Sequence, residues 1–231
     1  MRSPIQTRFE DLPEELAIFP LSGALLLPWG RLPLNIFEPR YLNMILDSLK
    51  TGRIFGMVQP DYDKTPKDKV IAENFIQESE PTIYSVGCAG RIASFEETDD
   101  GRLLILVKGL ARFRVVKEVE GQNGYRRVRA DFSAFRSDME PGPKFDFNRE
   151  QILGYLRRYL EVQSMPVNFE VLKGLSDSTL VTSLCMICPF DPREKQALLE
   201  AATMTERTAT LVTLLQMGIF DKSGPSDAPK Q

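Results

Sequence analysis

The chain has 231 residues, of which 42% are hydrophobic and 26% are charged, and its formal net charge at pH 7 is −3. This is the balance of a globular protein, and so small a charge gives no general attraction to nucleic acid or to an anionic membrane. Histidine is absent, which excludes Ser-His-Asp and Cys-His catalysis and histidine metal sites. No constellation of reactive side chains stands out, so we expect no enzyme, no cofactor and no metal.

The cysteines and the apolar runs indicate the compartment. Only Cys88, Cys185 and Cys188 are present, and an odd, small number argues against a secreted disulfide framework. The first ten residues contain no apolar core of a signal peptide. The aliphatic run Leu103–Val107 is far shorter than the roughly 20 residues that span a bilayer. We expect a cytoplasmic protein with no membrane partner.

The first predicted elements lie between residues 16 and 58. Two short apolar strands come first, and Pro20, Pro28 and Pro33 mark strand ends, edges or bulges because proline cannot donate to a sheet ladder. A helix is predicted from Pro39 to Lys50, since proline at the first helical position loses no hydrogen bond. Residues 54–58 form the next predicted strand.

Short strands at close spacing follow. The charged segment 61–69 is predicted to be a loop or insertion. Strands are predicted over 83–92, 102–107, 109–117 and 125–135, with turns at 96–101 and 122–124. Many short strands with one early helix indicate a small closed or half-closed antiparallel sheet, which we place at residues 14–136.

The second half of the chain is helical by its pattern. Residues 137–146 contain prolines and glycine and are predicted to be a linker. A helical bundle is predicted over residues 147–220, with helix starts at Asn148, Ser176, Asp191 and Thr203 and a short helix over 169–173. The tail, residues 221–231, is predicted to be disordered.

Three blocks in this order resemble one known family. They are Phe19-Pro-Leu with Ile36-Phe-Glu-Pro-Arg-Tyr41, Val86–Ile92 with Gly101–Arg114, and Pro192–Glu200 with the helix after it. Together they are similar to the N-terminal, substrate-binding domain of Lon protease. The resemblance extends from about Leu16 to Phe220.

The resemblance implies an α+β fold, a PUA-like antiparallel β pseudo-barrel followed by a helical bundle. It also implies a non-catalytic module that binds unfolded or extended polypeptide, an adaptor role in proteolysis or quality control, and a separate protease as candidate partner. No glycine precedes a lysine, so no P-loop is present, and few residues follow the predicted bundle. We therefore expect a stand-alone member without the ATPase and peptidase domains.

The candidate peptide-binding residues are Trp29, Leu27 and Phe37. Trp29 is the only tryptophan and lies in a predicted turn between Pro28 and Gly30. It is either a lid over the core or an exposed contact residue, and the pattern does not decide between them. If it is exposed, it is the first candidate to contact a bound peptide, with Leu27 and Phe37 as groove partners.

A separation of charge suggests a second site. Residues 102–136 contain nine bases and three acids, whereas residues 73–100 contain seven acids and one base. Arg112 and Arg114 share one strand face, as do Arg127 and Arg129. Either acidic side chains of neighbouring strands neutralise them, or they bind an anionic partner, an acidic peptide or RNA. An RNA-binding PUA-like protein is therefore the alternative function, in which nucleic acid would be the partner.

Cys185 and Cys188 form the only CxxC pair. A tetrahedral zinc site would need a second pair or histidines, and the chain has neither. The pair lies near the end of an apolar helix, which favours buried structural cysteines. A labile disulfide is the alternative.

Overall fold

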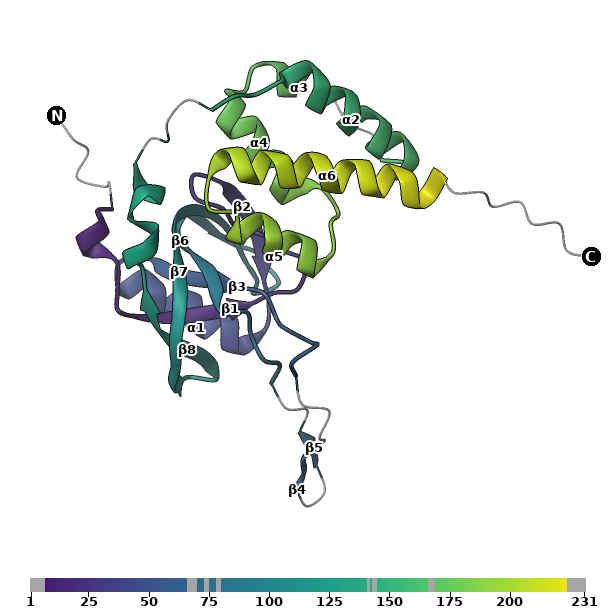
Figure 1. Cartoon of the computed structure of the whole chain (residues 1–231). Helices are drawn as coiled ribbons and strands as arrows, with labels where there is room; N and C mark the ends of the chain where they lie inside the picture. The colour runs from purple at the N-terminus through teal and green to yellow at the C-terminus, as the bar shows by residue number, and fades with distance from the viewer. Residues whose placement is uncertain are drawn as a thin grey trace, which may run out of the picture. The chain divides into compact units, whose positions relative to one another are not determined.

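The computed structural model of the chain describes residues 7–65, 70–72, 75–77, 80–140, 142, 145–165 and 169–223. The chain divides into two compact units, Met1–Gly142 and Pro143–Gln231. The first unit contains a β-barrel with one α-helix, and the second consists of helices (Figure 1). The expected α+β class is confirmed.

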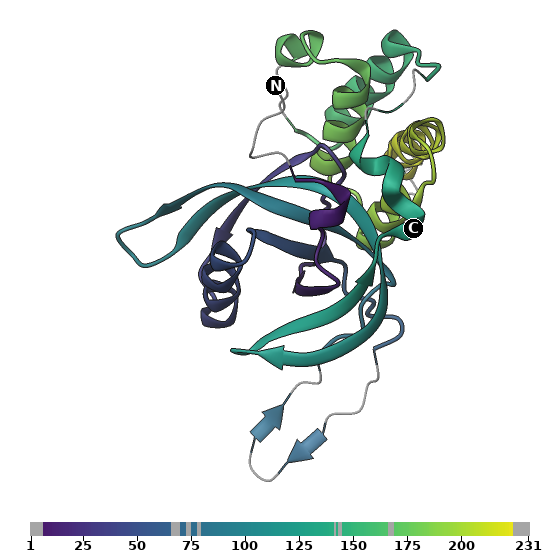
Figure 2. The ribbon, with the colours of Figure 1, turned by 90° about the vertical axis from the view of Figure 1, so that its left-hand side faces the viewer.

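Six strands build the main sheet of the first unit. They are β1 (Glu15–Pro20), β2 (Arg31–Ile36), β3 (Ile54–Val58), β6 (Val86–Glu97), β7 (Leu103–Gln122) and β8 (Tyr125–Asp131). Their order is β2-β7-β6-β3-β1-β8, and β8 pairs in turn with β7. This last pairing closes β7, β6, β3, β1 and β8 into a ring, and β2 is an edge strand attached to β7 (Figure 2). The expected pseudo-barrel is present, but β1 and β3 are parallel, so the sheet is not wholly antiparallel.

The long strand β7 makes the closure possible. It has 20 residues, where the sequence predicts two strands separated near Gly109. Its first part pairs with β2 and β6 and its second part with β8. The register shifts on both sides of this change of partner, and such irregularities bend a strand and increase its twist. One bent strand therefore takes the place of two.

The barrel interior is filled around Phe113, which is fully buried. A Cβ atom on Gly56 or on Gly87 would lie 2.7 Å from the Cζ atom of Phe113. Both glycines thus make room for the ring. The surrounding buried cluster is Leu16, Ile18, Ile54, Val58, Ala89, Ala111, Val128, Ala130 and Phe132.

Helix α1 (Pro39–Lys50) has the predicted bounds and packs against β1, β3 and β8. The ring of Tyr41 lies 4.2 Å from that of Phe19 on β1, measured between centroids. At the other end of α1, the Asp47 carboxylate accepts hydrogen bonds from the Asn123 amide and the Tyr125 hydroxyl, at 2.8 and 3.2 Å. The helix is therefore fixed at both ends to the strands.

A 3-10 helix, η2 (Ser133–Met139), follows β8 and packs on β7. The sequence predicts strand to residue 135 and a linker from residue 137, and both predictions are wrong here. Asp138 is buried beneath Arg112 of β7, so this segment belongs to the first unit. A shorter 3-10 helix, η1 (Phe9–Asp11), precedes β1.

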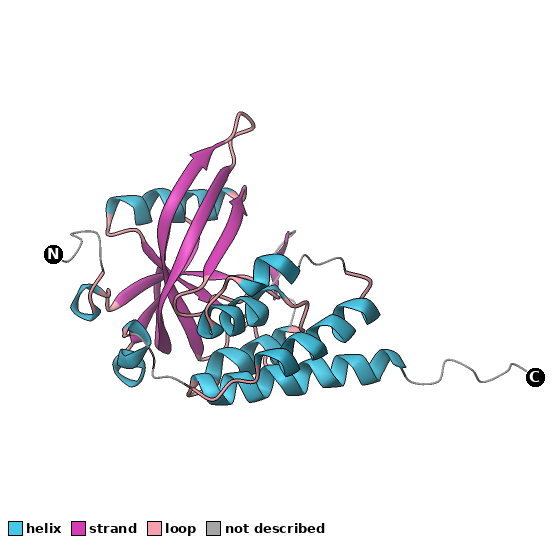
Figure 3. Cartoon of the chain, turned by 90° about the horizontal axis from the view of Figure 1, so that it is seen from above, coloured by secondary structure: helices cyan, strands magenta, loops and turns pink. Residues whose placement is uncertain are grey.

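The second unit contains α2 (Arg149–Val162), α3 (Phe169–Lys173), α4 (Asp177–Ile187), α5 (Pro192–Glu200) and α6 (Met204–Ser223) (Figure 3). Asn148 and Ser176 accept backbone N–H bonds at the starts of α2 and α4. Asp191 and Glu194 form the reciprocal capping box that the sequence predicts for α5. The predicted helix starts are confirmed.

Three expectations fall partly outside the described residues. These are the loop over 61–69, the linker over 137–146 and the tail over 221–231, in which residues 66–69, 141, 143–144 and 224–231 are not described. Residues 221–223 belong to α6, and the small strands β4 (Val70–Ala72) and β5 (Phe75–Gln77) follow the predicted loop.

Within the described ranges, no helix is long and apolar enough to cross a membrane.

Candidate polypeptide-binding surface

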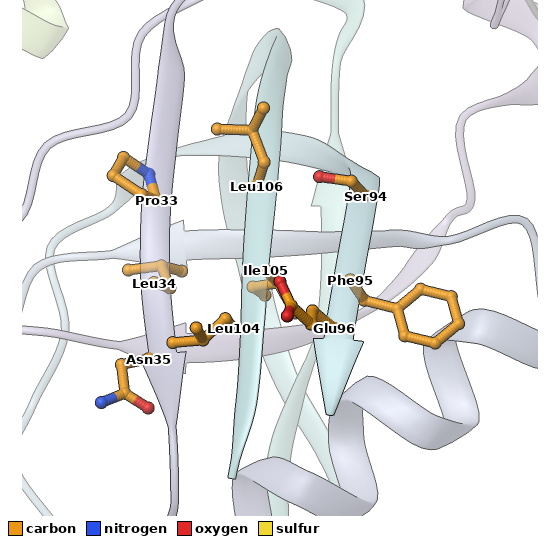
Figure 4. A pocket seen from close by; sticks show the side chains of 9 residues that line it. All are labelled: Pro33, Leu34, Asn35, Ser94, Phe95, Glu96, Leu104, Ile105 and Leu106. Carbon is orange, nitrogen blue, oxygen red and sulfur yellow. The ribbon is translucent and has the colours of Figure 1, made fainter. Parts of the chain in front are cut away.

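The outer face of β2, β7 and β6 carries rows of side chains set by the strand register. Pro33, Leu106 and Ser94 form one row across the three strands, and Asn35, Leu104 and Glu96 form the next. Directly paired residues lie on the same side of a sheet, so each row presents its side chains together. Figure 4 shows these residues on the three adjacent strands.

A groove of about 460 Å³ lies over these strands, and we call it the strand groove. It is lined by Pro33, Leu34, Asn35, Ser94, Phe95, Glu96, Leu104, Ile105 and Leu106. Leu103, Ile105 and Val107 are buried, whereas Leu104 between them is 42% exposed. β7 is therefore apolar on both faces at this point, and the outer face presents aliphatic side chains that a ligand can bury.

A basic row borders the strand groove. Arg31 of β2 and Arg91 of β6 are both paired with Lys108 of β7, one row beyond Pro33 and Leu106. Glu96 lies at the other end, beside Leu104. The surface is thus positive at one end and negative at the other, with apolar side chains between.

Trp29 lies next to the basic row. Its backbone adopts a left-handed conformation, with φ of 67°, and its N–H donates to the Gly109 carbonyl at 3.0 Å. The indole Nε1–H donates to the Asp138 carbonyl at 2.8 Å, and the ring centroid is 5.2 Å from the Lys108 ammonium. The side chain remains 50% exposed. Trp29 is therefore a half-exposed aromatic residue held in place by η2.

A cavity of about 120 Å³ connects these residues. Trp29, Arg91 and Lys108 line it, together with Thr7, Ala93, Gly109, Leu110 and Met139. Since Lys108 follows Leu106 on the same face of β7, the aromatic, basic and apolar residues form one continuous surface.

Residues 15–217 match the family described as the ATP-dependent protease La (LON) substrate-binding domain. The chain belongs to this Lon substrate-binding domain family. A crystal structure of a Lon N-terminal domain protein from Xanthomonas campestris has the same fold, with a TM-score of 0.55 and 24% identity, over 86% of this chain and 97% of that one.

Curated relatives of this Lon-type domain are much longer. Lon protease 2 of Myxococcus xanthus is 28% identical over 53% of this chain and 13% of its own length. Lon protease of Bacillus thuringiensis is 24% identical over 86% of this chain and 24% of its own length. The chain thus spans at most about a quarter of these two relatives.

The structure does not bring the three predicted peptide-contact residues together. Leu27 is completely buried in the core and lines neither cavity, so its expected place in a groove is wrong. Phe37 is 63% exposed after the end of β2, but it lines neither cavity. Trp29 alone borders the candidate surface.

Leu104 and Leu106 of the groove were not predicted. The run Leu103–Val107 was predicted to be a strand and to be too short for a membrane span, but it was not predicted to bind a ligand. A run of aliphatic residues in a hairpin strand also places alternate members on the outer face, and this signal could have identified them.

The predicted arginine site is wrong for Arg112. Its guanidinium is buried and forms two hydrogen bonds of 2.8 Å with the Asp138 carboxylate. Arg127 pairs with Glu15 of β1 at 2.8 Å, while Arg114 and Arg129 are exposed. Acidic residues of the same unit therefore neutralise Arg112 and Arg127, two of the four arginines.

Cys185 of α4 and Cys188, directly after the end of α4, are buried, free thiols. Burial raises the pKa of each to about 12. Among the described residues, no group of three or more His, Cys, Asp or Glu residues could hold a metal ion. The two cysteines have the environment of structural, unreactive residues.

Proposed function

We propose that this Lon-type domain recognises polypeptides by burying apolar side chains of extended or unfolded segments in the strand groove. The observation that carries this proposal is the aliphatic surface on the outer face of the sheet, formed by Leu104 and Pro33, which are exposed, and by Leu106, which is half-buried. Membership of a substrate-binding family supports it.

The form of the groove determines the kind of binding. At about 460 Å³, it is within the range of small-ligand pockets, about 300–1,000 Å³, and fits a few side chains rather than a folded partner. Ordering an unfolded ligand costs conformational entropy, so the affinity should be weak and tolerant of sequence.

The edge strand β2 affects the mode of binding. An unpaired strand edge can add a ligand strand through backbone hydrogen bonds. Pro33 lies in the middle of β2 and has no N–H to donate, and proline is one of the devices that protect a sheet edge. We therefore propose that side-chain burial, and not addition of a full strand, provides most of the affinity.

We further propose that the bound polypeptide is delivered to a protease. The curated relatives are Lon proteases, and the matched domain accounts for a minor part of their length. In this role the chain supplies recognition and the protease supplies hydrolysis. Co-incubation with a Lon-type protease should accelerate degradation of an unfolded substrate, and no change in rate would contradict this role.

Two variants of β7 test the recognition proposal. Leu104→Asp places a charge in the groove, whereas Val116→Asp places one at another exposed apolar position of the same strand, 58% exposed. The ligand is a fluorescently labelled protein that is kept unfolded by reduction and carboxymethylation, and its binding is measured by anisotropy. Circular dichroism confirms the fold of each variant. We expect at least tenfold weaker binding for Leu104→Asp and little change for Val116→Asp. Equal binding by the two variants would refute the strand groove as the binding site.

A further inference from the structure

We propose that the strand groove and the basic row together select extended segments of one pattern. In this pattern, apolar residues lie two and four positions away from an acidic residue, on the same side of it. This inference rests on the proposed function and specifies its ligand. The basic row is Arg31, Lys108 and Arg91. The apolar positions are Leu106 in the next row and Leu104 in the row after it.

The spacing follows from strand geometry. Lys108, Leu106 and Leu104 alternate along the outer face of β7, and two strand residues advance by about 6.8 Å. An extended ligand that runs along β7 has nearly the same rise, so its side chains i, i+2 and i+4 meet successive rows. An acid that pairs with Lys108 therefore places the next two side chains on that face against Leu106 and Leu104.

The charges at the two ends of the surface determine at which end the acidic residue of the ligand binds. Neither Arg31 nor Lys108 forms an ion pair with another residue in the described part of the chain. The Lys108 ammonium is exposed and lies 5.2 Å from the ring centroid of Trp29, a cation–π contact that holds the charge at the edge of the strand groove. At the opposite end, Glu96 beside Leu104 would repel an acid. One orientation of the acidic–apolar pattern is thus favoured over the other.

Labelled peptides of equal length with three residue patterns test the inference. The first has Asp with Leu at the second and fourth positions after it, and a reversed-order version covers the opposite chain direction. The second has Asn in place of Asp. The third has Asp with Leu at the first and third positions. We expect the first pattern, in one chain direction, to bind five- to tenfold more tightly than either of the others at low salt, with less difference at high salt.

Variants separate this inference from the proposed function. Lys108→Gln should reduce the Asp-to-Asn affinity ratio below twofold, whereas Lys117→Gln, at an exposed position farther along β7, should leave it unchanged. If the Asp and Asn peptides bind equally and Leu104→Asp weakens both, the inference is wrong and the proposed function stands. If no peptide binds and unfolded protein does not bind, both fail. Equal peptide affinities together with Lys108-dependent binding of a single-stranded RNA oligonucleotide would overturn the inference in favour of a nucleic-acid ligand.

Discussion

Arg112 and Asp138 form a buried ion pair that fastens η2 to the barrel. The Arg112 Nε and Nη2 atoms each lie 2.8 Å from a different carboxylate oxygen, and the Arg112 backbone N–H donates to the same carboxylate at 2.9 Å. Less than a tenth of either side chain is exposed. The pair also positions the Asp138 carbonyl that accepts the Trp29 indole N–H.

Removal of one partner should therefore destabilise the first unit. Asp138→Ala leaves the Arg112 guanidinium buried without its counter-charge, and loss of one partner of a buried pair costs about 3–5 kcal/mol. We expect that loss in the free energy of unfolding, measured by urea denaturation. Trp29 emission should also shift, because its hydrogen-bond acceptor is displaced.

An exposed pair beside it provides the matched control. Glu10 and Arg136 are 2.8 Å apart, and more than half of each side chain is exposed. Exposed pairs contribute about 0–1 kcal/mol, so Glu10→Ala should have little effect. Equal losses for the two variants would show that Asp138 does not act through its buried pair.

The sequence predicted the local elements well because their causes are local. Pro39 starts α1 and the Asp191–Glu194 box starts α5, and each can be recognised from a few neighbouring residues. The partner of Arg112 could not be predicted in this way, since Asp138 is 26 positions away and follows a hairpin. The parallel pairing of β1 with β3 also depends on long-range closure of the ring.

Gly109 should tolerate no side chain. A Cβ atom there would lie 2.0 Å from the Leu27 carbonyl oxygen, and that oxygen belongs to the backbone. Gly109→Ala must therefore displace the segment that ends at Trp29. Overpacking costs about 1–3 kcal/mol, and we expect a loss of at least this size by chemical denaturation, together with weaker peptide binding.

Gly154 of α2 is the control for this change. A Cβ atom at Gly154 meets no heavy atom within 4 Å. Alanine in a helix is favoured over glycine by about 0.8–1.0 kcal/mol, so Gly154→Ala should stabilise the second unit. A neutral Gly109→Ala would contradict the tight approach between Leu27 and β7.

Asp47 should make the stability depend on acid pH. Hydrogen bonds from Lys50 and from Asn123 hold the pKa of this carboxyl below its ordinary value of 3.8. A carboxyl whose pKa is lower in the fold stabilises the protein above its unfolded pKa, and this contribution is lost as the pH falls through the folded pKa. Asp47→Asn should therefore be less stable than wild type at pH 6, and the two should converge below about pH 4. Parallel stability curves from pH 6 to pH 2 would contradict this.

The candidate surface was only half predictable. The exposure of Trp29 depends on its turn, which the flanking Pro28 and Gly30 indicate. The burial of Leu27 and the close approach of its backbone carbonyl to Gly109 both depend on the fold, and nothing in the local sequence reveals a contact between positions so far apart. The basic row likewise appears only when the register pairs Arg31 and Arg91 with Lys108.

The thiols of Cys185 in α4 and of Cys188 directly after it should resist modification in the native protein. Burial raises the pKa of Cys185 and of Cys188 to about 12, so almost no thiolate is present at pH 8, and Cys88 is buried as well. With an aromatic disulfide reagent, we expect no rapid reaction of the native chain and modification of all three cysteines in guanidinium. Ser178→Cys, at an exposed position of the same helix, supplies a control thiol that should react at once. Two rapidly reacting thiols in the native wild-type protein would overturn the buried assignment. A labile Cys185–Cys188 disulfide would instead leave one reactive thiol in guanidinium without reductant and three after reduction.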